Sequence, residues 1–145
     1  MTDDERALRA LAAAGLDAIS WREGQAPDWQ RFFGPYVDGA VLCPSARPAV
    51  TTTPDAFRAR MEAQRTSNAL RSLEERPLGT SVQVFGNVAT VLSAFEMRAN
   101  GGAPARGVNA YLCVKDDGLW KIVAVAWDNE SAAAKLPSDL ERADP

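Results

Sequence analysis

The apolar residues of this chain change their spacing near Thr80, and that change limits the folds available to it. Before Thr80 they recur about every 3.6 residues, as in an amphipathic helix, and after it they alternate with a period of 2, as in a strand. Strands are expected at 81–98, 107–115 and 119–128, joined by turns. Helices followed by an antiparallel meander are typical of an α+β domain.

Two helices are predicted before residue 36. Thr2, with a glutamate three residues later, has the spacing of a capping box at the start of a helix over 3–14. Gly15 is the expected C-cap of that helix. Asp28 can cap a short second helix, rich in aromatic residues, which Pro35 ends.

A short strand and a long helix are expected next. Asp38-Gly39 is interpreted as a turn, 40–43 as a strand and 49–52 as a second extended stretch. Thr, Pro and Asp at 53–55 are the residues favoured at a helix start, so a long helix is expected over 54–73. Its inward residues are expected to be Phe57, Met61, Leu70 and Leu73, and Pro77 and Gly79 are expected to close it.

The alternation in the meander predicts two faces of a sheet. Gly86-Asn87 is interpreted as a bulge or bend in one long strand that preserves the alternation. One face then collects a large apolar set with a few polar residues: Phe85, Ser93, Phe95, Met97, Asn109, Tyr111, Cys113, Val123, Val125 and Trp127. The other collects Thr90, Leu92, Glu96, Arg98, Ala110, Leu112, Trp120, Ile122, Ala124 and Asp128. The first face suits the lining of a ligand cavity or a core.

The chain contains no histidine. This excludes Ser–His and Cys–His nucleophile pairs, histidine metal sites and any imidazole acid or base. Cys43 and Cys113 each lie inside an apolar run, which favours core packing over a metal pair or redox motif, with a disulfide as the alternative. We therefore expect no metal and no cofactor.

The charge balance of the chain also indicates which classes of partner it can bind. Sixteen Lys and Arg against 19 Asp and Glu give a net charge of −3, without the basic surface of a nucleic-acid binder. The N-terminus is acidic where a signal peptide would be basic, and no apolar stretch approaches the ~20 residues of a membrane span. We expect a cytoplasmic protein that binds neither nucleic acid nor membranes. One domain is expected over 1–130, followed by a short helical turn and a mobile tail over 131–145.

Four segments resemble a known family: 84–89 (VFGNVA), 94–98 (AFEMR), 107–111 (GVNAY) and 115–123 (KDDGLWKIV). With the order of elements, they are similar to the nuclear transport factor 2-like superfamily, in its SnoaL-like, polyketide cyclase-like bacterial branch. The resemblance covers residues 5–130. It implies a cone-shaped, cystatin-like fold with a curved antiparallel sheet wrapped around a long helix, two further N-terminal helices and a pocket at the open end. Homodimers through the outer face of the sheet are common in this superfamily.

The superfamily includes isomerases, cyclases and dehydratases as well as proteins without an assigned activity. Isomerases of this fold carry a carboxylate just before a proline on the first short strand, where this chain has Cys43, and scytalone dehydratase uses pocket histidines that this chain lacks. The remaining candidates for a base are Asp38 and Asp128, and Tyr36 or Tyr111 could donate a hydrogen bond to a carbonyl oxygen. For each of these four residues a structural role is the alternative.

Two main hypotheses follow. The first is a dimeric domain that binds a small apolar or aromatic molecule in a hydrophobic pocket and lacks a catalytic set. Its expected lining is Trp29, Phe32, Tyr36, Phe57, Phe95, Asn109, Tyr111 and Trp127. The second is an enzyme that isomerises, cyclises or dehydrates a polyketide-like or steroid-like carbonyl substrate. A third reading is an interaction domain that contacts a partner through the face with Glu96, Arg98, Leu112 and Trp120.

Overall fold

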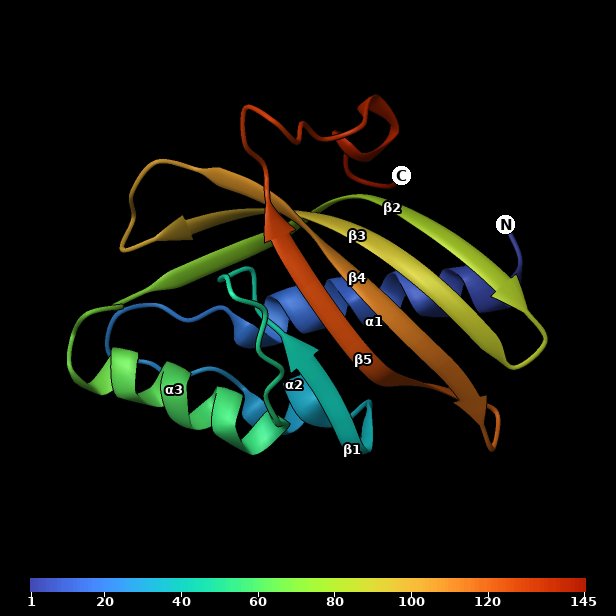
Figure 1. Ribbon diagram of the computed structural model, residues 1–145, viewed down its shortest axis with the longest axis horizontal. Helices are drawn as coiled ribbons and strands as arrows, with labels where there is room; N and C mark the ends of the chain where they lie inside the picture. Colours follow the sequence, from blue (N-terminus) through green and yellow to red (C-terminus); the bar gives the residue numbers. More distant parts are fainter.

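The computed structural model describes all 145 residues and confirms the α+β class. Its elements in chain order are α1 (Asp3–Ile19), α2 (Trp29–Phe33), β1 (Tyr36–Cys43), α3 (Pro54–Thr66), β2 (Leu73–Phe85), β3 (Val88–Ala99), β4 (Ala105–Asp116), β5 (Leu119–Asn129) and a 3₁₀ turn at Ser138–Leu140 (Figure 1). The sheet order is β1-β5-β4-β3-β2. Neighbours from β2 to β5 are antiparallel, whereas β1 runs parallel to β5, so the sheet is mixed.

Helix α1 begins as predicted and ends later. Thr2 and Glu5 form both hydrogen bonds of the capping box. The helix continues through Gly15 to Ile19, because Leu16 and Ile19 extend its buried stripe. The C-cap prediction at Gly15 was therefore wrong, since packing of the following turn outweighs the low helix propensity of glycine.

The long helix predicted over 54–73 stops at Thr66. Thr53 caps α3 and Pro54 occupies its first turn, as expected, but Asn68 adopts a positive φ of 63°. Strand β2 then begins at Leu73, where β3 supplies antiparallel partners from Ala99 onward. Pairing with β3 outweighs the helix propensity of the glutamates and arginines in this segment.

Two predicted turns also differ from what the structure shows. Gly86 and Asn87 do not bend one long strand but form the hairpin turn between β2 and β3, with φ of 57° at Gly86. Asp38 and Gly39 do not form a turn and instead lie within β1, where the register against β5 shifts. Gly39 has φ of 79° there, which only glycine adopts readily.

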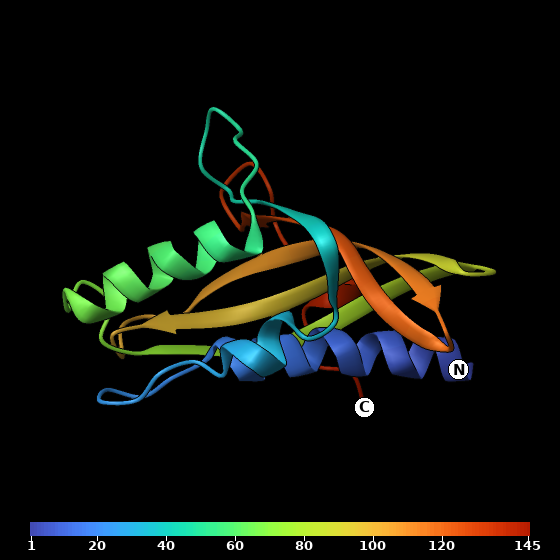
Figure 2. The same cartoon turned by 90° about the horizontal axis from the view of Figure 1, so that it is seen from below.

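The sheet is strongly curved, and the helices cover one of its faces. Helix α1 packs along β2, and α3 lies by β1 at the opposite edge of the sheet. In Figure 2, α1 runs along the bottom of the view and α3 lies at the upper left, so the two helices lie near different edges of the curved sheet. The longest helix is thus α1 rather than the segment after Thr53.

Two register features move residues between the predicted faces. A shift in the β4–β5 pairing places Cys113 opposite Ile122 and Leu112 opposite Ala124, so Trp120 and Ile122 are buried in the core. The β2–β3 turn pairs Phe85 with Val88, which is also exposed, so Phe85 lies on the outer face and is 86% exposed. The predicted outer positions of Trp120 and Ile122 and the predicted inner position of Phe85 were therefore wrong.

The C-terminal segment packs on the outer face of the sheet (Figure 1). Leu136 and Leu140 are buried against Leu78 of β2 and Ala94 of β3. A Cβ at Gly79 would lie 2.7 Å from the carbonyl oxygen of Asp139 and the same distance from Cα of Leu140, so glycine permits this close approach. The segment also reaches α1, where Asp144 forms an ion pair with Arg9 at 3.1 Å.

Candidate functional site

A cavity of about 280 Å³ lies between α1, α3 and the inner face of the sheet. Fifteen of its 21 lining residues are hydrophobic. Seven of the eight residues expected to bind a ligand lie on its wall: Phe32, Tyr36, Phe57, Phe95, Asn109, Tyr111 and Trp127. The exposed residues Arg60, Ala99 and Asn129 belong to the same lining and form its rim.

Trp29 is the eighth predicted residue, and it lies outside the cavity. Its indole is buried and stacks on Phe33 with ring centroids 5.7 Å apart. Its Nε1–H donates a hydrogen bond to Oε1 of Glu62 at 2.6 Å. The prediction that Trp29 lines the pocket was wrong, because the buried face of α2 turns it toward α3 rather than toward the sheet.

Aromatic rings from four elements contact one another along the cavity wall. Phe57 of α3 meets Trp127 of β5 edge-on at 5.6 Å and stacks on Phe32 of α2 at 6.1 Å. Phe32 in turn lies 5.9 Å from the ring of Tyr36 on β1. Edge-to-face and stacked contacts at these spacings are the favourable arrangements of aromatic pairs. They hold one side of the cavity in a fixed shape.

The carboxylates proposed as bases do not face the cavity. Asp38 is exposed on β1, and Asp128 is exposed near the end of β5, where its Oδ1 accepts a hydrogen bond from the backbone N–H of Asn129 at 2.9 Å. Neither residue belongs to the cavity lining. The suggestion that either serves as a base in the cavity was therefore wrong.

Glu75 of β2 is the carboxylate that does face the cavity. It lies opposite Met97 of β3, another lining residue, whereas the adjacent Glu74 is exposed opposite Arg98. The carboxylate oxygens of Glu75 make no hydrogen bond or ion pair within the chain, and burial alone raises the pKa of Glu75 to about 7. A carboxyl group with such a pKa can hold or release a proton near neutral pH.

Tyr36 and Tyr111 bring two phenol groups to the same cavity. Burial raises the pKa of both hydroxyls, and the charge of Glu75 contributes to the rise at Tyr111. Both phenols therefore stay protonated and keep their O–H donors at neutral pH. Neither hydroxyl has a hydrogen-bond partner in the chain, so both are free to bind a polar group of a ligand.

Glu75 could not be identified from the sequence because residues 74–76 were interpreted as the close of the predicted helix, before Pro77, and not as part of a strand. Glu74, Glu75 and Arg76 are good helix formers, and they follow a helix that the sequence predicts correctly at its start. The available signal was Pro77, which ends a helix yet is tolerated on an edge strand. Only the pairing with β3 shows that Glu75 and Glu74 point to opposite faces.

No protein-family model matches the chain, and no curated protein matches it. Solved structures do. A protein of unknown function with a cystatin-like fold from Nostoc punctiforme superimposes with a TM-score of 0.70 at 11% identity, over 91% of this chain and 95% of the other. An NTF2-like protein of unknown function from Pseudomonas putida gives 0.69 at 16%, over 97% and 98%.

This chain has the NTF2-like fold. A third structure with this fold, from Novosphingobium aromaticivorans and provisionally named a scytalone dehydratase, gives a TM-score of 0.64 at 15% identity, over 98% and 92% of the two chains. At the position before Pro44, which the resemblance makes important in isomerases, Cys43 is half-buried and outside the cavity lining. No helix in the NTF2-like fold of this chain is long and apolar enough to cross a membrane.

Proposed function

We propose that this chain binds a small, largely apolar molecule in the cavity between α1, α3 and the sheet. The observation that carries the proposal is the combination of an apolar wall with polar groups that have no partner in the protein: Glu75, Tyr36 and Tyr111. Ligand pockets have this composition, whereas core polar groups are normally paired. The volume of about 280 Å³ suits a ligand of one or two rings.

A thermal-shift and native mass-spectrometry screen of apolar ketones, alcohols and amines tests the binding proposal. Gly15 of α1 lines the cavity, and a Cβ there would have only the Tyr111 hydroxyl, at 3.8 Å, within 4 Å. Gly15→Leu should therefore fill the cavity and abolish stabilisation by ligands, while Gly15→Ala, the matched control, should keep it. Absence of any stabilising compound, or equal stabilisation of Gly15→Leu, would contradict the proposal.

Glu75 and Tyr111 also support a second candidate function, proton transfer on a carbonyl compound. In this reaction the Glu75 carboxylate takes a proton from the carbon next to the carbonyl group, and the Tyr111 hydroxyl donates a hydrogen bond to the carbonyl oxygen as negative charge develops there. The test is exchange of the α-protons of a cyclic ketone with deuterated solvent, followed by NMR. Exchange that Glu75→Gln abolishes supports this function, and exchange at the uncatalysed rate contradicts it.

A homodimer through the outer face of the sheet is part of the proposal. Large apolar side chains stay exposed on that face: Phe85, Val88, Leu92 and Leu112. Exposed apolar surface of this kind marks interaction sites. The C-terminal segment covers only the part of the face around Ala94, so the other part is free for a second copy. A cytoplasmic location remains a prediction from the sequence.

A further inference from the structure

The Glu75 carboxyl group is the one acidic group in the wall of the cavity, and nothing in the chain neutralises it. Its only protein hydrogen bonds belong to its backbone, where Ser20 of α1 accepts from N–H at 2.9 Å and donates to C=O at 3.3 Å. Glu75 is half-buried, and an ionised carboxylate that faces an apolar cavity without a partner is costly, so a ligand that supplies a donor or a positive charge gains binding free energy there.

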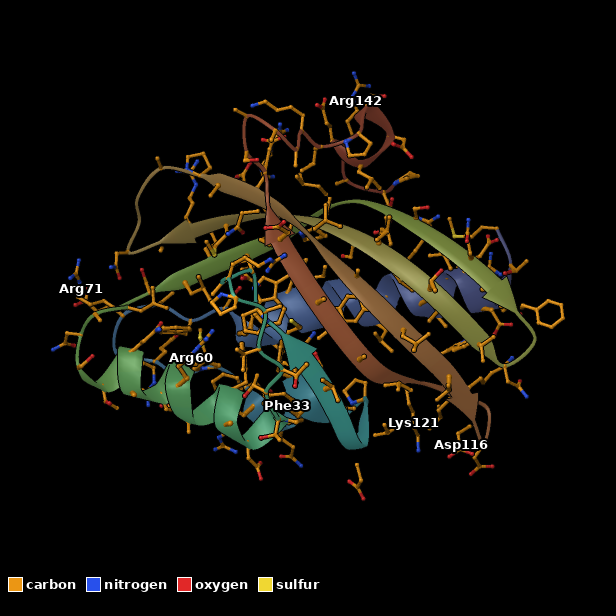
Figure 3. All side chains as sticks on the ribbon, viewed as in Figure 1. Phe33, Arg60, Arg71, Asp116, Lys121 and Arg142 are labelled. Atoms are coloured by element: carbon orange, nitrogen blue, oxygen red, sulfur yellow. The ribbon has the colours of Figure 1, made fainter.

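The charges around Glu75 are few on the cavity side. The parts of α1, β3 and β5 in the lining carry no charged residue. The titratable groups that β1 and β4 bring to the lining are the phenols of Tyr36 and Tyr111. The one charged group from α3 is Arg60. Arg60 projects from α3 at the rim (Figure 3), with its guanidinium carbon 5.8 Å from the centre of the Phe57 ring. The pKa of Glu75 reflects burial without a resolved contribution from Arg60.

The other flank of Glu75 borders a polar groove at the β2 edge. Its charged residues are of both signs: Asp17, Arg22, Glu23, Glu74, Arg76 and Arg98. Arg76 pairs with Glu96 at 2.9 Å on the outer face. None of these residues forms an ion pair with Glu75, so the interior of the cavity carries a negative charge when Glu75 is ionised.

The walls of the cavity suit a cation as well. Phe32, Tyr36, Phe57, Tyr111 and Trp127 present aromatic rings to it. A cation near the face of an aromatic ring is attracted by the ring's quadrupole, and the attraction grows where water is excluded. The two phenol oxygens can also accept hydrogen bonds from an ammonium group.

We infer that the cavity selects a protonated amine on an apolar skeleton, with its ammonium group paired to the Glu75 carboxylate, and rejects carboxylate ligands. This inference rests on the proposed binding function and specifies its ligand class. An ammonium group donates charge-assisted hydrogen bonds, which are stronger than those from a neutral alcohol. A ligand carboxylate would face Glu75 with like charge in a water-poor cavity.

Three probes with one skeleton test the inference by calorimetry: phenylpropylamine, its ketone analogue benzylacetone, and phenylpropionate. We expect the amine to bind at least about tenfold more tightly than the carboxylate at about pH 8.5. Affinity for the amine should rise several-fold from about pH 6 to about pH 8.5, because Glu75 ionises in that range while an alkylamine, with a pKa of about 10, stays charged.

Glu75→Gln should remove the preference for the amine, and Glu74→Gln, one residue away on the opposite face, should keep it. The pH dependence in the unmodified protein gives an independent readout if Glu75→Gln fails to fold. Ketone or carboxylate binding as tight as amine binding, or an amine preference that survives in folded Glu75→Gln, overturns this inference and leaves the binding function intact. Failure of all three probes overturns the binding proposal as well.

Discussion

Glu75 of β2 and Tyr111 of β4 face the same cavity, and the charge of the Glu75 carboxylate contributes to the raised pKa of the Tyr111 hydroxyl. Strand β3 lies between β2 and β4 in the sheet, and both side chains reach the cavity from the inner face.

Burial of Glu75 predicts that the protein loses stability as pH rises. Its pKa is about 4.5 in the unfolded chain and about 7 in the folded chain, so the folded state binds more protons between these values. Stability should fall by up to about 3 kcal/mol from about pH 5 to about pH 7.5 and then level off. The chain has no histidine to titrate in this window.

Urea unfolding at several pH values measures the effect. Glu75→Gln should flatten the curve in this window, and Glu74→Gln, the exposed neighbour, should leave the slope unchanged. Asp4 and Glu62 have lowered pKa values, caused chiefly by hydrogen bonds from Lys115 and Trp29, so their contributions are lost only at lower pH. A wild-type slope that matches the Glu75→Gln slope would show that Glu75 is ionised throughout.

Gly15→Ala should stabilise the protein by about 0.5–1 kcal/mol. Gly15 lies inside α1, has no positive φ and has space for a methyl group, so alanine lowers the entropy of the unfolded chain without strain. Chemical unfolding measures the change. A loss of stability would show that the wall of the cavity next to Tyr111 cannot accept even one methyl group.

Gly79→Ala should destabilise the protein, in contrast to Gly15→Ala. Its methyl group would collide with the backbone at Asp139 and Leu140, so the C-terminal segment would have to leave the sheet. Leu140→Ala should cost about 2–5 kcal/mol because it empties a buried position in the same contact. Hydrogen exchange should then increase in β2 near Leu78. Unchanged exchange there in both variants would show that the segment does not protect the strand.

Leu112→Glu should convert the proposed dimer into monomers, because it places a charge in the centre of the exposed apolar face. Sedimentation velocity measures the molecular mass. Leu119→Glu is the matched control, since Leu119 is exposed at the β4–β5 turn, away from the centre of that face. A wild-type monomer at high concentration would contradict the dimer proposal directly.

Local signals in the sequence predicted the helix starts and the last two strands, because caps and strict alternation depend on neighbours along the chain. Thr53 and Pro54 specify where α3 begins in this way. The end of α3 and the start of β2 depend on pairing with β3, which no local pattern contains. For the same reason, alternation alone could not place Trp120 in the core, since the register shift opposite Cys113 arises between strands.

The same distinction between local signals and pairing between strands applies to the candidate site. Tyr111 and Asn109 were found because they alternate on a strand, whereas Glu75 was missed because its segment has the composition of a helix. Asp38 and Asp128 were proposed from their positions in chain order, and the structure shows both exposed. Its place in the cavity wall and the absence of a partner distinguish Glu75 from the other carboxylates, and both are properties of the folded chain.

Mapping a bound probe on the isotope-labelled protein by NMR tests the central claim most directly. The chain should be titrated with phenylpropylamine, benzylacetone and phenylpropionate in turn. We expect the tightest binder to shift the backbone amides of Tyr36, Glu75 and Tyr111, and we expect Gly15→Leu to abolish these shifts. Shifts confined to the outer face around Leu92 and Leu112, or none with any probe, would contradict a ligand site in this cavity.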